Sequence, residues 1–234
     1  MSKLPILMYH KVSTTDSQGL TIASERLEAQ FRFLSENNYR SYHFSELTAL
    51  RKLPQKKNVV ITFDDGYVNQ LEFAVPLLEK YNLKATFFIP LKYVGAEDQW
   101  NENTSAIMDA ETLRSLNPMT IELAYHSYEH EKYNHLSPGE IEVDTLKAFE
   151  AASEMALPMA PFLAYPFGKF PRKNPEKAQF FQQLEKHQFV YGLRIGNRLN
   201  AFPFTDPFEL QRIDVKGQWK LKKFRRKLKY GNLI

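Results

Sequence analysis

Two short stretches of the sequence carry side chains suited to binding a cation. The first, "ITFDDGY" (residues 61–67), places Asp64 and Asp65 side by side after a run of β-branched and aromatic residues. Asp is disfavoured in strands and adjacent carboxylates repel each other, so this pair needs either a turn or a cation. Gly66 permits the positive φ of a turn, which leaves both explanations open at this point.

The second stretch, "HSYEH", places His126 and His130 four residues apart. If helical turns follow the preceding strand, both imidazoles project from one face and can bind one divalent cation. A carboxylate from another element would complete three ligands and leave open positions for water and substrate, the pattern of a catalytic metal site. Two histidines and one Asp suit zinc, and also cobalt, nickel or iron, better than magnesium or calcium.

The elements that must position these residues follow an alternating pattern of apolar runs and amphipathic helical stretches. Seven strands are predicted, within residues 5–12, 58–63, 84–90, 120–127, 161–168, 189–195 and 210–215. Helices are predicted at 24–38, 69–82, 109–116, 137–156 and 174–188. This order predicts an α/β fold, an irregular, TIM-like (β/α) barrel of about seven parallel strands, with an open doubly wound sheet as the second choice. No GxGxxG or phosphate loop supports a nucleotide-binding domain.

Composition indicates one domain spanning residues 1–234, with an uneven charge. The chain has no cysteine, which excludes disulfides and cysteine-based zinc sites. Its net charge of +4 comes from residues 216–229, which carry eight Lys and Arg and no acidic residue. A basic C-terminal helix is predicted at about 216–230, either solvated or attracted to an anionic membrane surface. Nucleic acid is not an expected partner, because no aromatic-interleaved strand platform accompanies the charge.

The N-terminal stretch "MSKLPILMYHKV" lacks the long apolar core and small-residue cleavage site of a secretory signal. No run approaches the roughly 18 apolar residues of a membrane-spanning helix. These features predict a cytoplasmic protein, with peripheral membrane contact through the basic helix as an extension of that prediction.

The order "TFDDGY" and then "HSYEH" resembles the first two motifs of the polysaccharide deacetylase family, also called the NodB homology domain or carbohydrate esterase family 4. "MYHKV" and "AYPFGKF" resemble the branch that acts on exopolysaccharides. The resemblance implies a metal-dependent hydrolase that removes N-acetyl groups from amino sugars in a polysaccharide, glycolipid or lipid-linked glycan. It makes Asp64 the general base. It makes Asp65, His126 and His130 the ligands of one divalent metal, zinc first.

The sequence departs from the family pattern at two motifs. The third motif usually carries an arginine that pairs with the base, but Ala164 occupies that place, so no guanidinium is expected beside Asp64. By resemblance, the backbone N–H of Phe167 serves the oxyanion. The C-terminal histidine motif that supplies a general acid is absent. His10, at the end of the first strand, is the predicted substitute and His135 a weaker one, while the competing explanation for His10 is a structural hydrogen bond.

Substrate contacts are predicted at Tyr67, Tyr165, Pro166 and Asp214, since aromatics at the rim can stack on sugar rings. Such aromatics also serve as core residues, and Asp214 also suits a strand-end turn. Two alternative functions remain, an O-acetyl esterase on the same scaffold and a non-catalytic carbohydrate-binding relative. The joint presence of the base and all three ligands favours the enzyme.

Overall fold

The structure is a computed structural model that describes residues 2–232. Its strands are β1 (Ser2–Leu4), β2 (Ile6–Tyr9), β3 (Lys11–Ser13), β4 (Thr21–Ala23), β5 (Arg40–Ser41), β6 (Asn58–Asp64), β7 (Ala85–Ile89), β8 (Ile121–Tyr125), β9 (Met159–Ala164), β10 (Tyr191–Ile195), β11 (Asn200–Phe202) and β12 (Leu210–Asp214). Its α-helices are α1 (Ser24–Glu36), α2 (Phe44–Thr48), α3 (Val75–Lys80), α4 (Ala110–Ser115), α5 (Pro138–Glu154), α6 (Glu176–Lys186) and α7 (Leu221–Tyr230).

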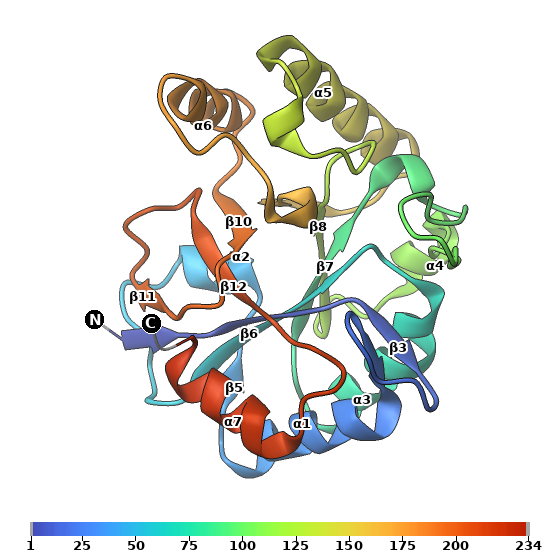
Figure 1. Ribbon diagram of the computed structural model, residues 1–234, viewed down its shortest axis with the longest axis vertical. Coiled ribbons are helices and arrows are strands. Elements are labelled where there is room, and N and C mark those ends of the chain that lie inside the picture. Colours follow the sequence, from blue (N-terminus) through green and yellow to red (C-terminus); the bar gives the residue numbers. More distant parts are fainter. Residues whose placement is uncertain (1, 233–234) are drawn as a thin grey trace.

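Seven parallel strands close into a barrel that the helices surround (Figure 1). The strand order is β2-β12-β10-β9-β8-β7-β6, and pairing of β2 with β6 closes the ring. The short strand β5 pairs with the N-terminal end of β6. The predicted (β/α) barrel is therefore confirmed, and the open sheet is excluded by the β2–β6 pairing.

Alternate residues along the barrel strands pack into an inner cluster and into outer clusters. Val60 and Phe88 belong to the cluster inside the barrel, which Phe44 of α2 also joins. Ile61 and Phe87 belong to the cluster between the strands and the outer helices. Because both faces of such strands are buried, they read as continuous apolar runs in the sequence. This explains why all seven barrel strands are visible from the sequence alone.

The helical segments differ in detail from the prediction. The segment after β6 opens with a π-helical turn, η1 (Gln70–Ala74), before α3 begins. Within the basic stretch, residues 216–220 precede the helix, and α7 packs Phe224 edge-on against Phe33 of α1. No helix within residues 2–232 combines the length and the apolarity needed to cross a bilayer.

The carboxyl ends of the barrel strands meet at one rim, because all seven strands are parallel. Asp64 ends β6 and Asp214 ends β12, while His10 and His126 directly follow β2 and β8. The strand ends that carry polar groups in the sequence are therefore brought together by barrel closure.

Candidate active site

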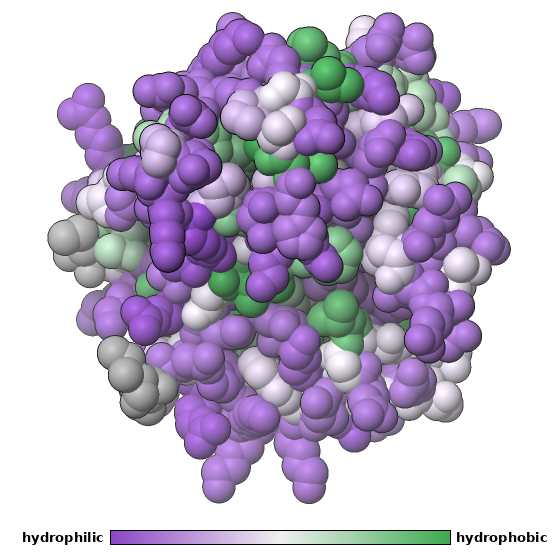
Figure 2. Space-filling view, turned by 45° about the horizontal axis from the view of Figure 1, so that its top comes forward, coloured by the Kyte–Doolittle hydropathy of each residue, from purple (hydrophilic) through white to green (hydrophobic). Residues whose placement is uncertain are grey.

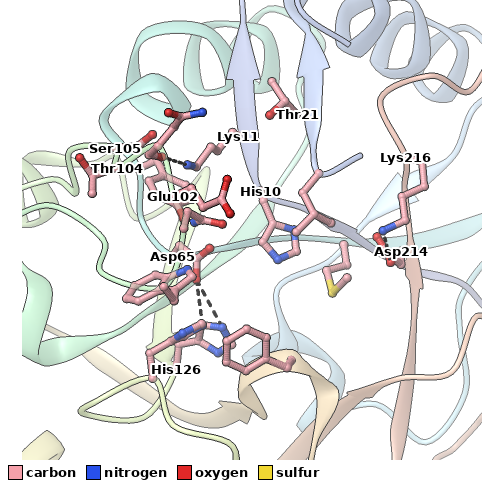
Figure 3. A pocket seen from close by; sticks show the side chains of 18 of the residues that line it. His10, Lys11, Thr21, Asp65, Glu102, Thr104, Ser105, His126, Asp214 and Lys216 are labelled. Atoms are coloured by element: carbon pink, nitrogen blue, oxygen red, sulfur yellow. Dashed lines mark hydrogen bonds and ion pairs between the residues drawn. The ribbon is translucent and has the colours of Figure 1, made fainter. Parts of the chain in front are cut away.

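A cavity of about 860 Å³ opens at this rim. Figure 3 shows Asp65 and His126 approaching each other, with His10 beside them and Asp214 farther along the same wall. The face of the molecule drawn in Figure 2 is hydrophilic over most of its area, with small hydrophobic patches between the polar groups. The side chains that line the cavity include His10, Asp65, Trp100, His126, His130, Phe167 and Asp214.

The Asp64–Asp65 pair lies in a turn that also directs a carboxylate into the cavity. Asp65 has a φ of 74° and Gly66 a φ of 66°, so both adopt the left-handed region. A non-glycine residue there is uncommon and occurs where the surrounding structure enforces it. The turn explanation of the two carboxylates is therefore correct, and it is compatible with a cation.

Asp65, His126 and His130 form a buried cluster of three metal-type donors. Asp65 Oδ1 lies 3.5 Å from His126 Nε2 and 3.3 Å from His130 Nε2. One donor atom from each residue fits within 4.8 Å of the other two. Apart from these imidazoles, Asp65 Oδ1 has no hydrogen-bond partner within residues 2–232. An unsatisfied buried carboxylate oxygen facing two imidazole nitrogens fits a divalent cation well.

The protonation state of His126 also suits metal binding. His126 Nδ1 donates a hydrogen bond to the carbonyl of Ala164 at 2.7 Å, which directs the lone pair of Nε2 toward Asp65. Burial lowers the pKa of His126 to about 4, so the imidazole is neutral near pH 7. Burial acts to raise the pKa of Asp65, but the hydrogen bond and charge of His130 and the other histidines outweigh it and hold that pKa well below its usual range.

The "HSYEH" segment is a loop, so the expectation of helical turns after the strand is wrong. Ser127 and His130 have φ values of 67° and 60°. Asp144 of α5 replaces the helical hydrogen bonds, because its carboxylate accepts from the N–H groups of Tyr128 at 3.1 Å and Glu129 at 2.9 Å. This loop brings His126 and His130 together. The spacing of the two histidines in the sequence does not indicate that α5 supports the loop.

Asp64 has a guanidinium partner, which corrects the expectation drawn from Ala164. Arg212 on β12 donates from Nη1 to Asp64 Oδ1 at 2.5 Å and from Nη2 to Oδ2 at 2.7 Å. Both side chains are almost fully buried. Burial acts to raise the pKa of Asp64, but the charge and hydrogen bonds of Arg212 together with the charges of His126 and His10 outweigh it, and the net shift is downward. The available signal was an arginine in the middle of an otherwise buried strand, which needs a buried partner.

The two predicted acid candidates lie in different places. His10 Nε2 is 3.8 Å from Asp64 Oδ2, and His10 lines the cavity. His135 closes a short 3-10 turn, η3 (Tyr133–His135), and is not a lining residue of that cavity. Of the two histidines, only His10 lies near Asp64 and at the cavity.

Phe167 and Asp214 line the cavity, whereas the predicted sugar-stacking aromatics are not exposed. Tyr165 has no exposed surface, and its hydroxyl donates to the carbonyl of Phe208, which excludes it as a stacking surface. Pro166 is likewise buried beneath the rim. Tyr67 lines the cavity but is 1% exposed, with its hydroxyl bound to Asp98. Tyr67 and Tyr165 support the rim, because each finds a buried polar or aromatic partner.

One wall of the cavity comes from the loop of residues 97–105, for which no helix or strand was predicted, and residues 100–105 of this loop line the cavity. Trp100 from this segment lies against His130, with ring centroids 3.8 Å apart and planes 27° apart. The loop has no motif and no periodicity, so nothing in the sequence indicated that it contacts a metal-type donor.

Comparisons with known proteins agree with this arrangement. Residues 51–185, more than half of the chain, match the family model "Polysaccharide deacetylase". The Bacillus subtilis protein YxkH, which carries the same family name, is 29% identical over 181 residues, covering 76% of this chain and 61% of its own length. The chain thus spans about three fifths of that relative.

Two solved structures share the fold. The deacetylase PplD of Streptococcus pyogenes, in complex with acetate, superimposes with a TM-score of 0.80 at 18% identity, over 97% of this chain and 98% of its own. IcaB from Ammonifex degensii gives a TM-score of 0.77 at 19% identity, over 98% and 97%. The match to the family model, together with the barrel and the strand-end cluster that carries its two motifs, shows that this chain belongs to the polysaccharide deacetylase family.

Proposed function

We propose that the protein is a metal-dependent hydrolase that removes N-acetyl groups from amino sugars in a polysaccharide or lipid-linked glycan. The observation that carries the proposal is the buried Asp64–Arg212 pair next to the donors Asp65, His126 and His130. A carboxylate kept ionised beside a three-donor cluster, with an open cavity in front, suits metal-assisted hydrolysis of an amide.

The proposed ligands of one divalent ion are Asp65, His126 and His130. Zinc is the preferred ion, with cobalt, nickel or iron as alternatives. When bound, such an ion would lower the pKa of a coordinated water molecule and polarise the acetyl carbonyl. The chain's own contribution is to hold two Nε2 atoms and one carboxylate oxygen within 4.8 Å of one another, with the solvent side of the cluster open to the cavity.

Asp64 is the proposed general base. Its carboxylate accepts a proton from the attacking water, and Arg212 holds both oxygens so that the group stays ionised and oriented. His10, 3.8 Å from Asp64, is the proposed donor of a proton to the leaving amine. The backbone N–H of Phe167, at the cavity wall, is the proposed donor to the developing oxyanion.

Acetate release provides the direct test of the reaction. We expect release from N-acetylated chito-oligosaccharides by protein loaded with zinc or cobalt. Release only from O-acetylated sugars would identify an esterase on the same scaffold, and binding without release from either would identify a carbohydrate-binding relative.

The proposed partner is a glycan carried on a lipid, reached from the cytoplasmic side of an anionic membrane. The seven Lys and Arg side chains of residues 220–229 form no ion pair with other residues in the described range 2–232, and most are exposed. Each cation near an anionic surface contributes about 1 kcal/mol. The outer face of α7, opposite the buried Phe224 and Leu228, is thus available for such a surface.

Removal of a histidine ligand should abolish stoichiometric metal binding. We expect about one zinc per chain in the wild type, and loss of most of it in His126→Ala and in His130→Ala, because two remaining donors hold a divalent ion weakly. Metal analysis of protein purified without chelator is the measurement. His187→Ala, which changes a histidine on α6's C-terminal side, is the control. Equal metal in all four proteins would refute the ligand assignment.

Asp64→Asn should abolish turnover and leave metal bound, because an amide accepts no proton but keeps the shape of the side chain. We expect kcat to fall by at least about 100-fold, measured as acetate release by protein of known metal content. Activity within tenfold of the wild type at equal metal occupancy would remove Asp64 from the role of base.

The Asp64–Arg212 pair should couple strongly in stability. Arg212→Met leaves a buried carboxylate without its partner, and we expect a loss of about 3–5 kcal/mol in the free energy of unfolding. Adding Asp64→Asn to Arg212→Met should recover most of that loss. Urea denaturation of the two single variants and the double variant, in chelator, completes the cycle. Additive losses would show that the two side chains do not act as a pair.

Binding to lipid vesicles should depend on both lipid charge and salt. We expect the protein to sediment with vesicles containing phosphatidylserine, not with neutral ones, and to be released as salt rises because screening shortens the attraction to about 8 Å at physiological ionic strength. Replacing Lys222, Arg225 and Lys229 by Ala should weaken this binding.

The matched control for the vesicle experiment replaces three exposed lysines elsewhere, Lys52, Lys56 and Lys173, by Ala. This variant loses the same net charge and should still bind. Equal loss in both triple variants, or equal binding of the wild type to neutral vesicles, would contradict a specific role for α7.

A further inference from the structure

The two histidines of the cluster are held in different ways. His126 has the usual support of a metal-binding imidazole, because its Nδ1 donates to a backbone carbonyl and fixes the ring. His130 has a buried Nδ1 with no hydrogen-bond partner within residues 2–232. Another interaction must therefore fix the orientation of the His130 ring.

Two aromatic rings contact the imidazole of His130. The indole of Trp100 stacks on it with ring centroids 3.8 Å apart and an interplanar angle of 27°. The ring of Phe167 lies with its centroid 4.8 Å away, at 56°. Trp100 is itself fixed edge-on by Tyr93 at 5.0 Å. Aromatic contacts of this kind restrict rotation about the side-chain bonds, since turning the ring would break the stack.

The loop that carries Trp100 is fastened by a fully buried carboxylate two residues earlier. Asp98 has no exposed surface. Its Oδ2 accepts from the Tyr67 hydroxyl at 2.6 Å and lies 3.3 Å from Lys11 Nζ, and its Oδ1 accepts from the Ser105 N–H at 3.0 Å. The carboxylate thus connects the loop to the turn after β6 and to β3.

We propose that Trp100, fastened by Asp98, positions His130 for metal binding in place of the missing hydrogen bond to Nδ1. Trp100 and Asp98 are positioning residues, and neither supplies a metal donor. This inference rests on the proposed metal site and assigns to residues 97–105 a function at that site, beyond forming a wall of the cavity.

The test compares metal binding by Trp100→Ala, Trp100→Phe and Asp98→Asn with that of the wild type. Zinc affinity is measured by competition with a chromogenic chelator, and the coordination of His130 is followed by the visible spectrum of the Co²⁺ form. We expect zinc binding at least about tenfold weaker in Trp100→Ala, as for loss of other supports of metal ligands, with a changed Co²⁺ spectrum. Trp100→Phe, which keeps a stacking ring, should stay within about threefold of the wild type.

Asp98→Asn should weaken zinc binding in the same direction as Trp100→Ala, because the amide cannot hold Lys11 and the Tyr67 hydroxyl as the carboxylate does. The control is Trp219→Phe, which changes the chain's other tryptophan, far from the cluster in sequence and absent from the cavity wall. Thermal unfolding of each variant shows whether the variant is still folded. A general loss of folding would lower the unfolding temperature, and Trp100→Phe would then not recover zinc affinity.

The possible outcomes separate this inference from the proposed function. If the wild type binds neither Zn²⁺ nor Co²⁺, the proposed metal site is wrong and the inference fails with it. If the wild type binds and folded Trp100→Ala binds within twofold, with an unchanged Co²⁺ spectrum, the positioning role alone is refuted. Weak binding by Trp100→Ala that is restored in Trp100→Phe supports it.

Discussion

The interaction on which the site depends is the compensation of two buried carboxylates that neighbour each other in sequence. Asp64 and Asp65 are each 2% exposed, so neither can rely on water to remain ionised. Arg212 compensates the first, and two histidines face the second. A buried ion pair of this kind adds little net stability, because desolvation offsets much of the attraction. In the proposed reaction its value is chemical, since it keeps one carboxylate ionised as the proposed proton acceptor.

The separation of partners gives the two carboxylates different roles. Asp64 is held on both oxygens by one guanidinium, whereas Asp65 faces imidazoles whose lone pairs can be shared with a cation. Different surroundings therefore distinguish two chemically identical neighbours. Both carboxylates nevertheless lie near the same imidazole, with Asp64 Oδ2 3.8 Å and Asp65 Oδ1 3.5 Å from His126 Nε2.

Sequence patterns predicted the barrel and the positions of the cluster well, because both depend on local information. Continuous apolar runs identify buried strands, and polar groups at strand ends identify the rim. The pairing of Asp64 with Arg212 could not be predicted because it depends on which side chains cross the barrel interior, and Ala164 occupies the family's usual position for the arginine. Tyr165 was misplaced because an aromatic residue next to a motif looks the same whether it faces solvent or core. The loop carrying Trp100 has no periodicity from which its position could be inferred.

The origin of Arg212 has a consequence for when the protein can become active. The guanidinium comes from the last strand of the barrel, 148 residues after its partner in the chain. During synthesis on the ribosome, the motifs of β6 and β8 emerge long before β12 does. A nascent chain that has already made every proposed metal ligand still lacks the counter-charge of its base. The proposed hydrolytic activity therefore has to arise late, after translation of β12 and its insertion between β10 and β2.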